Sequence, residues 1–372
     1  MGNLKRKASD VALDAIAPAV NFFRQIKPKE NVVVLNDDDC DGVCSGTILN
    51  IVLREFCQCS PIQFSTEWSM SLNGKTLEKI FSCKPKYVVI SDVPGIDIDL
   101  LAKLSEKTKV LIVDHHVTHN YENVVYSNPR LLDAGAYIPA TYLAYKISKV
   151  LGVKNKKINW IAAVGVLGDH GVENCEDLFL ELKKEFPELV GSTELKSDKL
   201  FENAKIGLLT KIIDSGRVVK ADVGSNHVAK TLLEVDDYMD ILEGRTASAK
   251  KLLGWYKIVE KEFDKLMEEL KKKSVFIGNM IIFEFKSKLK LKSSLASAAA
   301  NNYPDKILVI TQDDGESCWI SMRRGRNVKI DLNKLIQSAI KNIPGSSGGG
   351  HPEAVGGSIP AKYKDVFIKN LA

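Results

Sequence analysis

The sequence lacks any hydrophobic run close to the roughly 20 residues that a membrane-spanning helix needs. Residues 1–20 are basic, but Asp14 and Pro18 interrupt their apolar part, so they make a poor secretory signal. No internal repeat is present, and the only compositionally biased tract is glycine-rich, at 344–357. We therefore expect a chain that has no membrane partner and stays in the cytoplasm.

The chain also lacks two cysteine pairs with the spacing that a structural zinc site needs. The chain has seven cysteines, an odd number, and they are scattered. Cys57 and Cys59 have only one residue between them, and no second pair follows. We expect free, buried thiols in a reducing compartment.

The length and charge of the chain indicate its general class. With 372 residues, the chain is longer than one hydrophobic core usually supports, so two domains are expected. The net charge is +5, and lysines cluster at 271–273 and 286–292. Such runs allow a polyanionic partner, although a solvated lysine face is their commoner origin.

The first half alternates apolar strands with helical stretches. Residues 32–35, 86–91 and 109–114 are continuous β-branched runs, as in strands buried on both faces of a parallel sheet. Residues 45–56 and 96–107 have helical periodicity. This order predicts an α/β fold with a doubly wound, mainly parallel sheet, in which ligands bind outside the carboxyl ends of the strands.

Each of the three predicted strands ends in acidic residues. Asp37, Asp38, Asp39 and Asp41 follow the first strand, whereas Asp92 and Asp114 end the other two. Taken alone, the first cluster is as typical of a calcium-like or merely exposed turn as it is of a catalytic metal site. Because the ends of parallel strands meet at one edge, we expect these carboxylates to converge there.

Two further segments bring ligand types to the same edge. His115 and His116 directly follow Asp114, and Asp169 lies in a glycine-flanked turn. Many carboxylates with one or two imidazoles suit Mn²⁺ or Mg²⁺ better than structural zinc. Two such ions would neutralise the repelling aspartates and activate water at a phosphorus centre.

The second half is expected to contain helices from about 138 to 273 and then a smaller α/β domain. Strands are expected within 274–285, 306–312 and 317–324, with a helix within 293–303. In the glycine tract, Gly348, Gly349 and Gly350 would let several backbone N–H groups converge on one anion. Read alone, this segment is also compatible with a flexible loop.

At this point the sequence resembles a known family. The segments DDDCDG (37–42), VISD (89–92), VDHH (113–116) and GDHG (168–171) resemble four ordered motifs of the DHH phosphoesterases. SSGGGHPEAVGG (346–357) resembles the GGGH motif of the DHHA1 domain. The resemblance covers residues from about 30 to 360. Within this family, the chain is most similar to RecJ-like single-strand exonucleases of the archaeal type.

This resemblance implies a role for each matching residue. Five residues would bind two divalent ions, with Mn²⁺ preferred and Mg²⁺ possible: Asp39, Asp41, Asp92, His115 and Asp169. Asp92 would bridge the ions, His116 would face the scissile phosphate, and Asp114 would orient the histidine pair.

The chain departs from the family pattern at one position. Where many members have a histidine before the first metal aspartate, this chain has Leu35, so Asp37 or a water would take its place. Asp38, His119 and His170 receive no assigned role.

The resemblance also implies domains and substrate contacts. It gives a DHH domain at 1–190, a helical connector at 191–272 and a DHHA1 substrate-binding domain at 273–372. The expected substrate contacts are Arg323, Arg324, Gly348, Gly349, Gly350 and His351.

The leading functional hypothesis is a two-metal phosphodiesterase that trims single-stranded DNA or RNA and releases mononucleotides. One alternative keeps the chemistry but takes short oligoribonucleotides or a cyclic dinucleotide. Another is a replisome scaffold bound to GINS and the helicase, and GINS is also a possible partner of an active enzyme. The intact ligand set favours activity.

Overall fold

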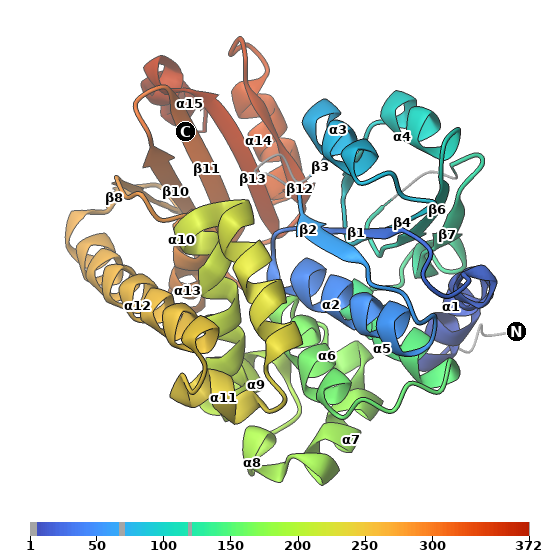
Figure 1. Cartoon of the computed structure of the whole chain (residues 1–372). Coiled ribbons are helices and arrows are strands. Elements are labelled where there is room, and N and C mark those ends of the chain that lie inside the picture. Colours follow the sequence, from blue (N-terminus) through green and yellow to red (C-terminus); the bar gives the residue numbers. More distant parts are fainter. Residues whose placement is uncertain (1–5, 67–70, 118–120, 372) are drawn as a thin grey trace, which may run out of the picture. The chain divides into compact units, whose positions relative to one another are not determined.

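The computed structural model describes residues 6–66, 71–117 and 121–371, and divides the chain into two compact units. The first extends to Tyr256 and the second begins at Lys257 (Figure 1). The division falls inside the long helix α12 (Ala247–Lys273). None of the helices in the described ranges is both long and apolar enough to cross a membrane.

The first unit is built on a five-stranded sheet with the order β2-β1-β4-β6-β7. Its strands are β2 (Ile62–Ser65), β1 (Val32–Asn36), β4 (Tyr87–Ser91), β6 (Lys109–Val113) and β7 (Val125–Ser127). All neighbouring pairs are parallel. The prediction of an α/β fold with a parallel N-terminal sheet is therefore confirmed, and the three predicted strands form its centre.

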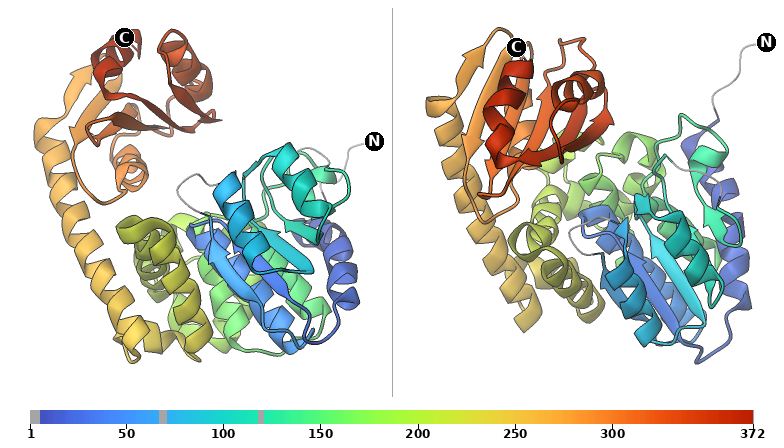
Figure 2. Two further views of the ribbon diagram at one scale, coloured as in Figure 1. Left: turned by 45° about the horizontal axis from the view of Figure 1, so that its top comes forward. Right: turned by 90° about the horizontal axis from the view of Figure 1, so that it is seen from above.

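Helices cover both faces of this sheet (Figure 2). Alternate strand residues point to opposite sides, so Val89 packs in one core while Val88 and Ile90 pack in another. The first face carries α1 (Ala8–Gln25), α2 (Cys40–Glu55) and α5 (Ala140–Val150), and the other carries α3 (Gly74–Ser82) and α4 (Ile98–Ser105). This burial on both faces explains why the strand sequences are continuously apolar.

More helices extend the core on the α2 side. They are α6 (Lys157–Gly168), α7 (Glu176–Glu185), α8 (Pro187–Val190), α9 (Ser197–Asn203), α10 (Lys205–Glu234) and α11 (Tyr238–Glu243). Leu200, Leu209 and Leu252 belong to the same core as α2. The helices of the expected connector, up to Tyr256, thus pack as part of the first unit.

Two glycines let α6 lie close to α2. A Cβ on Gly165 would come within 2.8 Å of the Cys44 Cβ, and one on Gly168 within 2.7 Å of the Cys40 Cβ. Because α6 ends at Gly168, this close packing fixes the position of Asp169, the next residue.

The second unit has a six-stranded sheet with the order β12-β13-β11-β10-β9-β8. Its strands are β8 (Val275–Ile277), β9 (Met280–Phe285), β10 (Ile307–Asp313), β11 (Ser317–Arg324), β12 (Ser347–His351) and β13 (Ala354–Pro360). Helices α14 (Leu332–Ile340) and α15 (Lys364–Leu371) pack on one face, and α13 (Lys292–Asn302) packs on the other (Figure 2). The remaining short elements are β3 (Ser71–Leu72), β5 (Gly95–Ile96) and three turns of 3₁₀ helix, Pro129–Leu131, Val172–Asn174 and Ala361–Tyr363.

The cysteines are free, as predicted, and all except the half-buried Cys83 are buried. The glycine tract is not a flexible loop, because it forms the edge strand β12 and part of β13. The Gly350 N–H donates to Asn333 Oδ1 at 3.2 Å, and the Gly348 carbonyl accepts from Gln337 Nε2. The anion contact expected of Gly348, Gly349 and Gly350 remains a prediction.

Candidate metal centre

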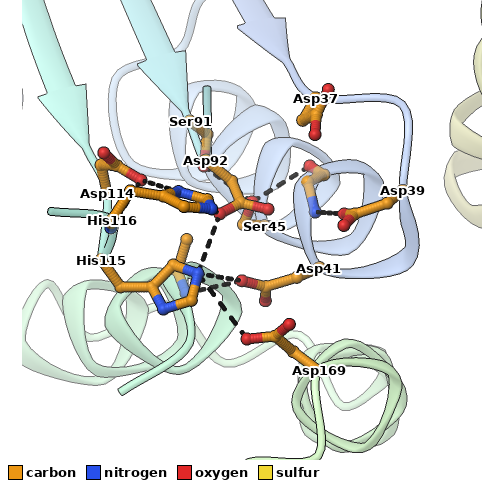
Figure 3. A network of polar contacts seen from close by, with 12 residues as sticks. Asp37, Asp39, Asp41, Ser45, Ser91, Asp92, Asp114, His115, His116 and Asp169 are labelled. Atoms are coloured by element: carbon orange, nitrogen blue, oxygen red, sulfur yellow. Dashed lines mark hydrogen bonds and ion pairs between the residues drawn. The ribbon is translucent and has the colours of Figure 1, made fainter. Parts of the chain in front are cut away.

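The acidic residues meet at the carboxyl edge of the first unit's sheet, where β1, β4 and β6 end (Figure 3). Asp41, Asp92, His115 and Asp169 point toward one another, whereas Asp37 lies apart from them. Asp92 and His115 follow the ends of β4 and β6, Asp41 lies in the first turn of α2, and Asp169 directly follows α6.

Asp41 is buried in the first turn of α2 and held by the start of another helix. Its carboxylate accepts hydrogen bonds from the backbone N–H groups of Ala140, at 2.8 Å, and Thr141, at 2.9 Å. These are orphan donors at the N-terminus of α5, where the helix dipole favours an anion. Burial, Asp169 and Asp39 nevertheless raise the pKa of Asp41 well above its usual range.

Asp92 lies directly after β4 in an unusual backbone conformation. Its φ is +60°, which is uncommon for a residue other than glycine and marks a constrained position. Its side chain is fully buried, and Oδ1 has no hydrogen-bond partner. Burial and the neighbouring aspartates raise the pKa of Asp92 well above its usual range. A buried carboxylate oxygen without a hydrogen-bond partner, among other carboxylates, suits a cation ligand.

His115 lies at the centre of the cluster. Its Nε2 is 3.3 Å from Asp92 Oδ1, 3.6 Å from Asp169 Oδ2 and 3.9 Å from Asp41 Oδ2. Burial lowers the pKa of His115 to about 4, so the imidazole is neutral at pH 7 and can ligate a metal.

His116 is more exposed and is oriented by Asp114. His116 Nδ1 lies 2.9 Å from Asp114 Oδ1 and 3.7 Å from Asp92 Oδ1. Although burial opposes the charged form, the hydrogen bond to Asp114 raises the pKa of His116 above its usual value.

Asp169 completes the cluster and is fixed by a tyrosine that sequence reasoning missed. Tyr137 Oη donates toward Asp169, at 2.7 Å from both its Oδ2 and its carbonyl oxygen. Burial and Asp39 raise the pKa of Asp169 to about 7. Tyr137 lies just before α5 in the chain, but nothing in its local sequence indicates this contact.

Within the described residues, two overlapping groups could each hold an ion. Asp41, His115 and Asp169 form one, and Asp92, His115 and His116 form the other, with ligand atoms within 4.8 Å of one another. Carboxylate oxygens plus imidazole match the donors that Mn²⁺ accepts. The donor set and the unpartnered Asp92 Oδ1 therefore fit a divalent-metal site.

Asp37, Asp38 and Asp39 lie outside these two groups. The Asp39 carboxylate caps α2 by accepting from the Gly42 N–H at 2.9 Å, although it faces the cluster closely enough to raise its neighbours' pKa values. Asp37 Oδ1 accepts from Thr66 Oγ1 at 2.8 Å. Burial, Asp39 and Asp38 raise the pKa of Asp37 to about 7. The roles expected for Asp37 and Asp39 remain predictions.

A cation missed by sequence reasoning lies beside this acidic segment. Arg217, in α10, pairs with Asp214 through Nε and Oδ1 at 2.6 Å. Although burial opposes its charge, Asp214 and then Asp39 raise the pKa of Arg217. A lone arginine in an ordinary helical pattern carries no signal that would place it here.

Other contacts hold the backbone of the histidine pair. Arg130 Nε donates to the His115 carbonyl at 2.7 Å, and Asn128 Nδ2 donates to the His116 carbonyl at 3.0 Å. His170 lies near the Phe201 ring and outside both ligand groups. His119 falls outside the described residues.

In the second unit, the two expected arginines differ. Arg324 bonds Glu353 Oε1 at 2.8 Å, whereas Arg323 contacts only Ser297 Oγ, Ser321 Oγ and the Met322 carbonyl. Within the described residues, no carboxylate pairs with Arg323. His351 is exposed at the end of β12.

Comparison with protein families identifies two domains. Residues 31–168 match the DHH family, N-terminal domain, and residues 278–372 match the DHHA1 domain. No match was found among curated protein sequences.

Solved structures share the fold at low sequence identity. RecJ of Thermus thermophilus in complex with Mn²⁺ is 16% identical with a TM-score of 0.71, over 97% of this chain and 54% of that one. An exonuclease RecJ bound to manganese is 15% identical with a TM-score of 0.67, over 100% and 95%. A DHH domain described as a member of the s1p family of ribosomal proteins is 17% identical with a TM-score of 0.75, over 99% and 91%.

The chain thus spans about half the length of the Thermus thermophilus RecJ that it matches. The two family matches follow each other in the order DHH then DHHA1, and each falls within one of the two compact units. This chain therefore contains a DHH-family N-terminal domain followed by a DHHA1 domain, and it has a RecJ-like fold.

Proposed function

We propose that this chain is a Mn²⁺- or Mg²⁺-dependent phosphodiesterase that removes mononucleotides from one end of single-stranded DNA or RNA. The observation that carries the proposal is the convergence of Asp41, Asp92 and Asp169 on neutral His115, with Asp92 Oδ1 left unpartnered. Burial and mutual repulsion raise the pKa values of Asp41 and Asp92, and bound cations would relieve the same repulsion that protons otherwise neutralise.

Divalent ions bound here would supply Lewis-acid polarisation of a phosphate and a more acidic water. Asp41 and Asp169 would hold one ion with His115. Asp92 belongs to the other group and would bridge the two ions, which its Oδ1 supports by lying 3.3 Å from Nε2 of His115, the residue that both groups share. The N-terminus of α5 and Tyr137 keep Asp41 and Asp169 oriented, as outer contacts do in other metal sites. Asp39 would ligate through Oδ2, because its Oδ1 already caps α2.

His116 is suited to contact the phosphate that reacts. Asp114 engages its Nδ1, so a protonated imidazole would have Nε2 left to donate a hydrogen bond, and the bond to Asp114 raises the pKa of His116 in favour of that form. A positioned cationic donor stabilises negative charge that grows on a phosphate oxygen during hydrolysis.

The second unit offers a separate phosphate contact. The Arg323 guanidinium is half-buried, and its hydrogen-bond partners are all neutral. It has therefore lost hydration without gaining an anionic partner. A phosphate would satisfy it, whereas Arg324 is already paired with Glu353. Single-stranded nucleic acid supplies phosphates at regular spacing, so it is the substrate class that we favour.

The test is hydrolysis of end-labelled single strands with Mn²⁺, run beside duplex DNA, a dinucleotide and a cyclic dinucleotide. We expect stepwise release of mononucleotides from single strands. Asp92→Asn should abolish this reaction, while Asp38→Ala should stay within a few-fold of wild type because Asp38 lies outside both ligand groups. Preferential cleavage of the dinucleotides would replace this proposal with the short-substrate alternative.

The scaffold function remains a prediction, as does GINS as a partner. Inactivity of the wild-type chain on every substrate, with Mn²⁺ bound, would favour that function over the enzymatic one.

A further inference from the structure

An exposed tryptophan lies on the sheet of the second unit. Of the tryptophans in the described ranges, Trp160 and Trp255 are buried, whereas Trp319 is 42% exposed. In β11, Cys318, Ile320 and Met322 point into the core shared with α14 and α15. Strand alternation therefore places Trp319, Ser321 and Arg323 on the opposite face, where α13 packs against β10 and β11. Ser321 is buried on this face, whereas the Trp319 ring remains partly exposed.

The neighbouring strand carries only small residues beside this ring. In the β11–β13 register, Trp319 is opposite Ser358, Ser321 is opposite Gly356, and Arg323 is opposite Ala354. A Cβ added to Gly356 would meet nothing closer than the Ile320 carbonyl oxygen, at 3.8 Å. No bulky side chain of β13 therefore covers the flank of Trp319.

The ring is oriented by a carboxylate and has a lysine near its face. Trp319 Nε1 donates to Asp314 Oδ2 at 2.9 Å, which fixes the indole, and Lys292 Nζ is 5.9 Å from its centroid. Arg323, on the same face, has the unpaired guanidinium described above. Arg323 lies four residues after Trp319, or about 13 Å along β11. The fixed aromatic ring suits the bases of a single strand. The lysine and the guanidinium, which has no carboxylate partner, suit its phosphates.

We propose that Trp319 is a stacking platform for one base of a single-stranded nucleic acid whose backbone phosphate binds Arg323. The choice of polymer rests on the proposed function, but the platform itself belongs to the second unit and needs no metal. Stacking on an aromatic ring tolerates any base, because every base has a π-face. The platform would therefore hold strands without selecting their sequence.

The test measures binding of a short fluorescein-labelled oligo-dT to the full chain by anisotropy, with a chelator present so that the strand stays intact. Removing one stacking ring weakens single-strand binding by roughly five- to a hundredfold, so we expect a loss of this size for Trp319→Ala. Trp319→Phe, which keeps an aromatic ring, should retain most of the affinity. Phe276→Ala is the matched control, because Phe276 is another exposed aromatic side chain of the same sheet, at 60%, on β8.

A strand with abasic positions separates stacking from other effects. Trp319→Ala should weaken the base-containing strand far more than the abasic one, because only the former has a ring to stack. Oligo-dT should also quench tryptophan fluorescence in wild type and much less in Trp319→Phe. Equal affinities of wild type and Trp319→Ala for oligo-dT would overturn the proposal, as would equal losses on both strands. Since none of these readouts depends on hydrolysis, failure of the enzymatic proposal would be seen separately, as absence of Mn²⁺-dependent cleavage.

Discussion

Replacing Asp92 by asparagine should make the metal-free protein more stable while removing its response to metal. Asparagine is the suitable change because it tolerates the positive φ of +60°, which an alanine would strain. It keeps the shape of the side chain and removes the charge. At pH 8 the wild-type carboxylate is buried among other aspartates and its Oδ1 is unpartnered.

The expected size follows from the cost of such a group. Leaving a buried polar group unsatisfied costs about 1–3 kcal/mol, and 1 kcal/mol shifts the melting temperature of a unit of this size by roughly 2–4 °C. We therefore expect metal-free Asp92→Asn to melt roughly 2–12 °C above wild type at pH 8.

The pH dependence has a definite sign. A carboxyl whose pKa is raised in the folded state contributes stability below its unfolded pKa, and this is lost as pH rises through the folded pKa. Asp169 and Asp37, with pKa values of about 7, and Asp92 all act in this direction. The stability of metal-free wild type should thus fall between about pH 4 and pH 8, and the advantage of Asp92→Asn should shrink toward pH 5.

With metal present, wild type should have a higher melting temperature than Asp92→Asn. An ion whose free concentration is a hundred times its dissociation constant stabilises the folded state by about 2.7 kcal/mol. For wild type this corresponds to a rise in melting temperature of roughly 5–10 °C. The assay is thermal unfolding followed by circular dichroism, with a chelator and then with Mn²⁺. A Mn²⁺-induced shift in Asp92→Asn as large as that of wild type would refute the assignment of Asp92 as a metal ligand.

Three further outcomes are expected. Affinity for single strands should fall with salt, with a log–log slope of roughly 0.7 for each phosphate contacted, and a flat response in a titration with NaCl would favour a small substrate. Arg323→Ala should weaken strand binding in anisotropy titrations more than Arg324→Ala, because Glu353 already neutralises Arg324; the reverse order would argue against the phosphate contact. Tyr137→Phe removes the hydroxyl that fixes Asp169, so calorimetry should give a Mn²⁺ affinity lower by about 10- to 100-fold, and an unchanged affinity would mean that Asp169 needs no such support.

The central strands and their acidic ends could be predicted from the sequence. Buried parallel strands produce continuous β-branched runs, and a carboxylate after each run has no structural reason within the strand itself. The positions of Asp41, Asp92 and His115 relative to one another then follow from the parallel order of β1, β4 and β6.

The supporting groups could not be predicted, because they come from distant parts of the chain. The α5 N–H groups that hold Asp41 lie about a hundred residues after it. Arg217 approaches Asp39 only because α10 packs against α2. Such contacts depend on how the helices pack, so the local sequence around each residue does not indicate them.

The glycine tract shows a different difficulty. Read locally, three glycines favour a loop or an anion-binding turn, but Val355 and Ile359 point into the core and pair β13 with β11. That long-range pairing extends Gly348–Gly350 alongside β13 as an edge strand. The tertiary register therefore overrides the local preference of glycine.

The most direct test of the metal centre is anomalous diffraction at the manganese edge from crystals of the chain soaked in Mn²⁺. The account predicts two peaks at the carboxyl edge of the first unit's sheet, one bonded to Asp41 and Asp169, with Asp92 bonded to both ions. A single ion bound elsewhere, or no ion among these residues at saturating Mn²⁺, would contradict it.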